Sequence, residues 1–282
     1  MVRRMVSERE VVELEGFPPL LLSVRHFSLM NSLLTVFNST EPGDPENTIA
    51  KYFLEHFENL DCLNVYDVAE ACYTSRSGIR RFCQSIGFDN FSALKSCEWE
   101  WGTHHKFFIG YADHPDFKHH LAVQIQRMTE SVNRQIGEEE LDSLAQLIHD
   151  ADNVVLLASD FSSMAVREFQ QSMLFMHKIT QILTDSFGSE SSLENLGPSD
   201  LVIVLSASGN YARAARNQLS RCAACRVLVT VGRDHGLQGF FDAVLHLSPD
   251  DHYGERTVYA KYGINYLFDL VYNRYFEKFC DR

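Results

Sequence analysis

Five short apolar runs in the second half of the chain limit the possible fold more than any other feature of the sequence. The runs are rich in leucine and β-branched residues and lie at 154–158, 181–184, 201–205, 226–231 and 243–247. Helical patterns separate the first run from the second, over 162–177, and the third from the fourth, over 211–222. Near-continuous apolar strands alternating with helices are typical of a parallel sheet that is covered on both faces. We therefore expect an α/β domain of about five parallel strands flanked by helices, closed by an aromatic-rich helix over 257–279.

The first third of the chain has helical spacing instead. Three apolar stripes stand out: Ile49, Phe53, Phe57 and Leu60; Val65, Val68, Ala69 and Cys72; and Ile79, Phe82, Cys83 and Ile86. Ser75 stands where a helix N-cap belongs, because its hydroxyl can accept from the open amides of the next turn. Gly87 is placed to end that helix, and turn-forming residues at 41–45 interrupt any helix there. We predict a small all-α domain of short helices joined by a tight turn.

The polar side of the third stripe carries three arginines and no acid. Its residues are Ser75, Arg76, Ser77, Arg80, Arg81 and Gln84. The chain as a whole has a formal charge of −13, and residues 1–100 hold 9 basic and 15 acidic residues. A basic second helix after a tight turn is the helix-turn-helix arrangement, in which that helix enters the major groove of double-stranded DNA. An ordinary solvated basic face is the alternative interpretation.

Several of these motifs resemble the RpiR/MurR family of bacterial transcription regulators. The resemblance rests on residues 65–72, on Thr74 and Ser75, on the Arg-Phe-Cys run at 81–83, on Gly87 and Phe88, and on 91–95. It implies a helix-turn-helix domain followed by a SIS (sugar isomerase) domain, in a dimer or tetramer that binds DNA and senses a sugar phosphate. Gly78 departs from the family pattern, in which a threonine or another helix former is usual. Glycine costs about 1 kcal/mol in a helix interior, and it removes a possible contact in the groove.

The same resemblance suggests how the chain is divided. We expect an N-terminal extension at 1–29, the helix-turn-helix domain at 30–102, a linker at 103–125 that is rich in histidine, and the SIS domain at 126–282. Typical family members begin near Met30, so residues 1–29 are either an extension or an over-long start assignment.

A candidate ligand loop follows the third apolar run. Ser206, Ser208, Gly209 and Asn210 resemble the phosphate loop of SIS domains, and a helix N-terminus behind a serine-glycine turn suits an anion. The loop after the first run has lost the glycines of the family, and Asp160 would repel a phosphate. Ser162 and Ser163 either bind a sugar hydroxyl or cap the following helix. The alternative to a sensor is therefore a domain that only dimerises.

An enzyme is the second functional hypothesis. Aldose–ketose isomerisation needs a base, and His252 and Glu255 lie after the fifth run. The same stretch also fits a solvated loop, and family members are generally sensors, so we expect no catalytic residue and no enzyme activity. Cys222 and Cys225 have a CxxC spacing, but no second pair lies nearby to complete a zinc site, and adjacent histidines do not form a chelate, so no metal or cofactor is expected. No secretory signal or membrane-length apolar run is evident, which predicts a cytoplasmic protein.

Overall fold

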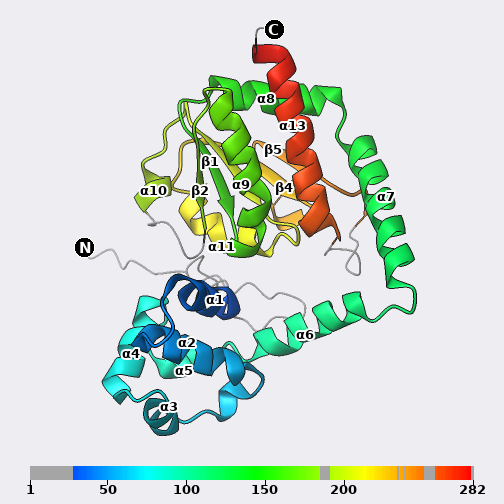
Figure 1. The fold of residues 1–282 in the computed structure, drawn as a ribbon. Coiled ribbons are helices and arrows are strands. Elements are labelled where there is room, and N and C mark those ends of the chain that lie inside the picture. The colour runs from blue at the N-terminus through cyan, green and yellow to red at the C-terminus, as the bar shows by residue number, and fades with distance from the viewer. Residues whose placement is uncertain (1–27, 185–190, 234, 238, 251–257, 281–282) are drawn as a thin grey trace, which may run out of the picture.

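The computed structural model describes residues 28–184, 191–233, 235–237, 239–250 and 258–280. A helical domain is followed by a domain built on a parallel sheet (Figure 1). The fold class that the sequence predicts is therefore confirmed. No helix in these ranges is long and apolar enough to cross a bilayer.

The helical domain packs around one apolar core. Its elements are α1 (Leu29–Ser39), α2 (Pro45–Glu55), the 3-10 helix η2 (Phe57–Cys62), α3 (Val65–Ala71), α4 (Arg76–Ser85) and α5 (Phe91–Lys95). The stripe that begins at Ile49 is not one helix, since it starts in α2 and ends in η2. η2 is wound more tightly than an α-helix, and Asn59 within it has non-helical backbone angles. The domain thus has more helices than the three stripes indicate.

The turn at 41–45 separates two helices of this domain. Gly43 has a φ of +101°, a conformation that glycine adopts without strain, and Pro45 is the first residue of α2. Leu29 and Leu33 of α1 are fully buried in the same core as Ile49 of α2. The turn-forming residues therefore mark a boundary between helices and not between domains.

Two helices connect the domains. α6 (Trp99–Ala112) leads away from the helical domain and α7 (Phe117–Gln135) runs along the sheet domain, followed by α8 (Glu138–Asp150) (Figure 1). The predicted linker at 103–125 is thus mostly helical, with a break at 113–116. Few of its side chains are buried, which agrees with its polar, histidine-rich sequence.

All five strands of the sheet are parallel, in the order β2-β1-β3-β4-β5. Their bounds lie within one residue of the apolar runs: β1 Val154–Ala158, β2 Thr180–Leu183, β3 Leu201–Leu205, β4 Cys225–Thr230 and β5 Ala243–His246. The central strands β1 and β3 are buried along their whole length. This explains why their sequences show no alternation of apolar and polar residues.

Helices cover both faces of the sheet. Because successive residues of a strand point to opposite faces, neighbouring residues pack with different helices. Leu156 and Ile203 pack with α9 (Asp160–Phe175), α8 and the closing helix α13 (Ile264–Phe279). Val155 and Val202 face the other way and pack with α11 (Asn210–Leu219). The short elements α10 (Ser191–Glu194), η3 (His235–Leu237) and the π-helical turn η4 (Tyr259–Gly263) complete the chain.

Candidate nucleic-acid interface and ligand loop

The turn before α4 is tightly defined. The amide of Thr74 donates to the carbonyl of Ala69 over 2.9 Å, and Tyr73 has a φ of 51° with 96% of its side chain exposed. Ser75 is the N-cap of α4, and its hydroxyl accepts from the amide of Gly78 at 3.1 Å. This confirms the predicted cap. The turn that joins α3 to α4 is therefore short and closed by its own hydrogen bonds.

The end of α4 is also as predicted. Gly87 has a φ of +95°, the left-handed conformation common just after a helix. The amide of Phe88 donates to the carbonyl of Cys83 at 2.8 Å, closing the last turn. Phe82 lies in the core, where its ring stacks on Phe53 with 6.0 Å between centroids. Both ends and the buried side of α4 therefore hold it firmly against the domain.

The opposite side of α4 is exposed. The six predicted DNA-contacting residues all lie there: Ser75, Arg76, Ser77, Arg80, Arg81 and Gln84. Among the described residues, none pairs with Arg80 or Arg81, and α4 contains no acidic residue. The helix thus presents uncompensated positive charge on one surface, which is what a polyanion requires.

Arg76 differs from the other two arginines because Tyr66 of α3 holds it. Its Nη1 donates to the Tyr66 hydroxyl at 2.9 Å, and its guanidinium carbon lies 4.7 Å from the centre of the Tyr66 ring. Tyr66 itself is 60% exposed. The pair fixes the direction of the guanidinium at the surface before any ligand is bound.

Gly78 has a different meaning from the one the sequence suggests. A Cβ at this position would lie 2.3 Å from Oγ1 of Thr74, so the glycine makes room for the turn. Gly78 is also buried on the core side of α4. The expectation that it removes a groove contact is therefore wrong, because no side chain at this position would face solvent.

The candidate ligand loop lies between β3 and α11. The Ser206 hydroxyl accepts from the amide of Ala212 at 3.1 Å, and the Ser208 hydroxyl accepts from the amide of Asn210 at 3.3 Å. Gly209, with a φ of +83°, is the N-cap of α11. Ser206 is buried, whereas Ser208 and Asn210 are partly exposed. The loop is therefore folded around its own amides, with Ser208 and Asn210 at its open side.

The end of β4 packs directly on this loop. The amide of Gly232 donates to the carbonyl of Ala207 at 2.9 Å, and a Cβ on Gly232 would lie 2.9 Å from the carbonyl oxygen of Ser208. The next residue, Arg233, donates to Gln135 at 3.2 Å and to the carbonyl of Ser248. A cation therefore follows immediately after the strand end that supports the loop.

Ser162 and Ser163 lie in the first turn of α9, and both are buried. The N-cap is Ser159, whose hydroxyl accepts from the amide of Ser162 at 3.4 Å and donates to its hydroxyl at 3.3 Å. Since β1 and β3 are neighbours, this turn and the loop at 206–210 lie at the same edge of the sheet. No hydrogen bond between described residues joins them.

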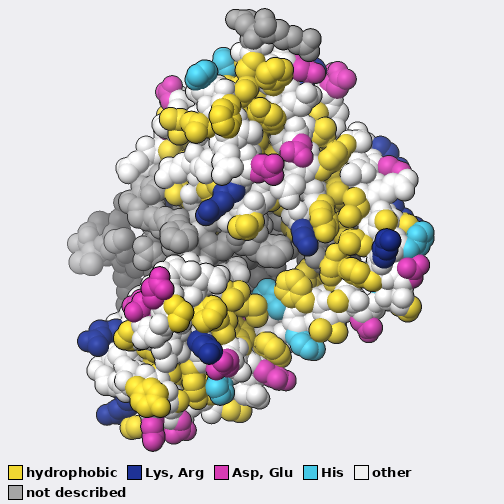
Figure 2. Space-filling view, in the orientation of Figure 1, with side chains coloured by type: hydrophobic (Ala, Val, Ile, Leu, Met, Phe, Trp, Pro, Cys, Tyr) yellow, Lys and Arg dark blue, Asp and Glu magenta, His cyan; other side chains and the backbone are white. Residues whose placement is uncertain are grey.

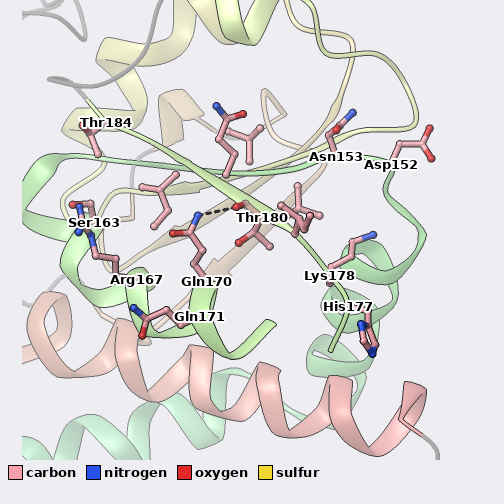
Figure 3. A pocket seen from close by; sticks show the side chains of 15 residues that line it. Asp152, Asn153, Ser163, Arg167, Gln170, Gln171, His177, Lys178, Thr180 and Thr184 are labelled. Carbon is pink, nitrogen blue, oxygen red and sulfur yellow. Dashed lines mark hydrogen bonds between the residues drawn. The ribbon is translucent and has the colours of Figure 1, made fainter. Parts of the chain in front are cut away.

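Ser163 lines a cavity of about 980 Å³ that follows the edge strand β2 (Figure 3). Gln170 donates to the carbonyl of Thr180 inside it at 2.7 Å. Lys178 lies at its far end and donates to the carbonyl of His149 at 3.0 Å. Burial lowers the pKa of Lys178. The residues that line the cavity include Ser163 but none of the 206–210 loop, so the cavity does not join the two predicted halves of the ligand site.

The residues weighed for catalysis and metal binding give no site in the described ranges. His252 and Glu255 lie outside the described residues. The seven cysteines are all free thiols, and burial raises the pKa of Cys83 to about 11 and of Cys97 to about 12. No group of three or more metal-ligating side chains lies together in the part of the chain that the structure describes.

Comparison with known protein families identifies the helical domain. The family described as "Helix-turn-helix domain, rpiR family" matches residues 38–100. These residues are an rpiR-family helix-turn-helix domain. The match contains the whole of α2, α3, α4 and α5.

Relatives of the chain carry the same kind of domain. The chain is 22% identical over 171 residues to the HTH-type transcriptional regulator GlvR of Bacillus subtilis, which covers 59% of this chain and 62% of that protein. It is 46% identical over 50 residues to an uncharacterized HTH-type transcriptional regulator of Caldanaerobacter subterraneus, 18% of each chain. The chain thus matches less than two thirds of the length of these curated relatives.

One solved structure has the same two-part fold over most of its length. It is the Vibrio vulnificus NanR protein complexed with ManNAc-6P, with a TM-score of 0.50 and 17% identity over 89% of this chain and 92% of that one. At this identity the likeness shows the fold alone.

Two residues near the sites were not predicted from the sequence. Tyr66 lies on α3 of the rpiR-family domain, ten positions before Arg76, and only the crossing of the two helices brings them together. The available signal was an aromatic residue beside the apolar stripe of this helix and not in it. Arg233 offered no signal, since its partners come from α7 and from the end of β5.

Proposed function

We propose that this protein is a transcription regulator that binds double-stranded DNA through α4 of its rpiR-family domain. The observation that carries the proposal is the exposed face of α4, with three arginines and no acid. In a helix-turn-helix domain this helix lies in the major groove. The fork of an arginine there donates to O6 and N7 of guanine, or to a phosphate. The names of the two relatives support this function.

We further propose that the protein acts as a homodimer or tetramer in the cytoplasm, without a cofactor and without catalytic activity, and that the domain at 126–282 senses a sugar phosphate. The loop at 206–210 supports this, since it combines hydroxyls, a glycine N-cap and a helix N-terminus at the carboxyl end of a parallel strand. NanR, which shares the fold, is complexed with a sugar phosphate. The ligand would act by favouring one of two dimer geometries and so changing the spacing between the two α4 helices.

DNA binding is tested with duplexes that the full-length protein selects from a random-sequence pool, using fluorescence anisotropy at several salt concentrations. Replacing Arg80 or Arg76 by alanine is expected to cost about 1–3 kcal/mol if that residue reads a base, or to flatten the salt dependence by about one unit of slope if it contacts a phosphate. Arg221→Ala is the matched control, because it removes the same charge from an exposed residue of the other domain. Unchanged affinity and salt dependence in both α4 variants would contradict the assignment of α4 to the groove.

Ligand sensing is tested by thermal shift with hexose, pentose and N-acetyl amino-sugar phosphates, against the same sugars without phosphate. A ligand at one hundred times its Kd adds about 2.7 kcal/mol of stability. Ser208→Ala should abolish the shift, because it removes a hydroxyl of the loop at 206–210. Ser163→Ala tests in the same way whether the turn after β1 contributes to binding. If no phosphosugar shifts the melting temperature, the domain serves only to dimerise.

A further inference from the structure

The cavity between α9 and the edge strand β2, which we call the β2 cavity, has a lining that suits a small polar molecule. Its volume of about 980 Å³ lies in the range of small-molecule sites. Four of the residues that line it have amide side chains and three have hydroxyls, whereas four are aliphatic. Amides and hydroxyls both donate and accept hydrogen bonds, as the hydroxyls of a sugar do. The lining therefore matches a polyhydroxylated molecule better than an apolar one.

One positive charge in this lining has no counterpart. Arg167 of α9 is exposed, and no described residue forms a hydrogen bond or an ion pair with it. In Figure 3 it lies with Ser163 at one end of the cavity, whereas Lys178 and Asp152 lie at the other. Lys178 differs from Arg167, because it donates to backbone carbonyls and lies near the carboxylates of Asp150 and Asp152. The Arg167 end of the cavity thus presents a cation that no described carboxylate pairs with.

A guanidinium in this position can bind an anion. Its planar fork donates two hydrogen bonds at once to a carboxylate or to a phosphate. Figure 2, in the orientation of Figure 1, shows a basic group at the surface of the sheet domain over α9. Gln171, which also lines the cavity, lies one helical turn from Arg167, about 5.4 Å along the axis. A single sugar ring can therefore contact both side chains.

Thr180 provides a second, independent observation. It lines the cavity and is only 5% exposed, and its hydroxyl has no hydrogen-bond partner among the described residues. Gln170 donates to its carbonyl at 2.7 Å, which fixes this residue in the cavity wall. A buried hydroxyl without a partner costs stability. A hydroxyl of a ligand in the cavity would supply that partner.

We propose that the β2 cavity binds an acidic sugar, a polyhydroxylated molecule with one anionic group that is a carboxylate or a phosphate. The anionic group binds Arg167, and hydroxyls of the sugar bind Gln171 and Thr180. No residue of the loop at 206–210 lines the cavity, so this is a second site, and it does not rest on the phosphosugar loop of the proposed function. The chain would then bind two ligands, one at the carboxyl end of β3 and one along β2.

The test is isothermal titration of the full chain carrying Ser208→Ala, which removes the contribution of the loop at 206–210. The probes are glucuronate, glucose 6-phosphate and uncharged glucose. We expect at least one of the two acidic sugars to bind, and glucose to bind at least about tenfold more weakly, because a hydrogen bond to a charged group is lost. Binding of glucuronate alone identifies a carboxylate ligand, and binding of glucose 6-phosphate alone identifies a phosphate. No binding of either acid, or equal binding of glucose, would overturn the proposal.

Arg167→Met removes the charge and keeps most of the side-chain length, so it should weaken the acidic probe about tenfold or more and leave glucose unchanged. Arg127→Met is the matched control, because Arg127 is an exposed arginine of α7 that has no partner among the described residues and lies outside the cavity. Equal effects of the two substitutions would contradict the assignment of the anion to Arg167.

Thr180→Val distinguishes a ligand contact from a structural role. It removes the hydroxyl and keeps the shape, so it should weaken the acidic probe about fivefold. The melting temperature of the free chain should stay the same or rise, because an unpaired buried hydroxyl is lost. A lower melting temperature with unchanged affinity would show that the hydroxyl is structural and overturn this part of the site.

The two ligand proposals can fail separately. A phosphosugar shift that is lost with Ser208→Ala and kept with Arg167→Met, without any binding in the Ser208→Ala chain, would support the loop and contradict the β2 cavity. Binding in the Ser208→Ala chain that is lost with Arg167→Met would support the β2 cavity, whatever the loop binds.

Discussion

Helices α4 and α11 both start shortly after a serine and have a glycine at or near their first turn, but the two helix starts differ in what surrounds them. The Ser75 cap of α4 is exposed, and the helix turns three arginines to solvent. Ser206, before α11, is buried, and the carbonyl of Ala207 in the same loop accepts from the amides of Val231 and Gly232, just after β4. The same local chemistry therefore leaves an open basic surface at one helix start and a closed turn at the other.

The difference lies in what each helix rests on. α4 packs on a small helical core with one side only, so its polar side stays available. α11 covers a face of the sheet, and the loop that leads into it accepts hydrogen bonds from the residues that follow β4. The sequence around a serine cap gives little information about which of these surroundings a helix will have.

The largest effect is expected when the apolar core beneath α4 is disrupted. Phe82→Ala should destabilise the helical domain by about 3–5 kcal/mol, because a buried ring is removed and a cavity remains. Both tryptophans, Trp99 and Trp101, lie in α6 beside this domain, so their fluorescence during urea unfolding follows it. Phe108→Ala, at a position 44% exposed on α6, should change stability little. Equal effects of the two substitutions would mean that α4 is not held by its core.

The two serine caps can be compared directly. Ser206→Ala should cost about 1–3 kcal/mol, because it leaves the amide of Ala212 buried without an acceptor. Ser75→Ala should cost about 1 kcal/mol, since water can replace an exposed cap. Urea unfolding followed by circular dichroism and by tryptophan fluorescence measures both, with Ser220→Ala, at an exposed serine just after α11, as control. A larger cost at Ser75 than at Ser206 would reverse the comparison.

A smaller effect is expected where Tyr66 holds Arg76. Tyr66→Phe keeps the ring under the guanidinium and removes only the hydrogen bond, so affinity for selected DNA should fall by about 0.5–1 kcal/mol. Tyr66→Ala should cost more, because the ring is lost as well. In an Arg76→Ala background neither change should matter further. Additive losses in that background would show that Tyr66 acts independently of Arg76.

The smallest effect concerns a third helix start, that of α1. Glu100 is buried and accepts from the Ser28 hydroxyl at 3.1 Å and from the amides of Leu29 at 2.7 Å and Met30 at 3.1 Å. Burial raises the pKa of Glu100, although these hydrogen bonds oppose the shift. The folded chain therefore binds this proton more tightly than the unfolded chain does. The contribution of Glu100 to the free energy of unfolding should fall as pH rises from the ordinary pKa of glutamate through the raised one.

Glu100→Gln removes this titration and keeps the side-chain shape. The difference in unfolding free energy between wild type and variant should depend on pH only within that window, as measured by urea unfolding from pH 4 to 8 (roughly the range that brackets a raised glutamate pKa). A wild type that gains stability relative to the variant as pH rises would contradict the sign. The start of α1 therefore differs from those of α4 and α11, because its amides donate to the carboxylate of Glu100, 70 residues further along the chain. We interpret this contact as a structural one.

Much of this molecule follows from its sequence. The five apolar runs predicted the strands to within about one residue, most clearly at β1 and β3, which are buried on both faces and contain no polar residue. Ser75, Gly87 and the stripe that contains Phe82 predicted the bounds of α4, because capping and helical spacing depend only on nearby residues. The exposed positions of all six candidate residues on α4 follow from the same periodicity.

What the tertiary structure alone decided involves partners that are distant in the chain. The pairing of Tyr66 with Arg76, the burial of Glu100 against α1, and the approach of Gly232 to Ser208 depend on how helices and strands cross. The role of Gly78 also required the structure, because only the position of Thr74 in the turn shows why a side chain is excluded there. Periodicity determines which side of a helix is apolar, and packing determines what that side, and the one opposite, will meet.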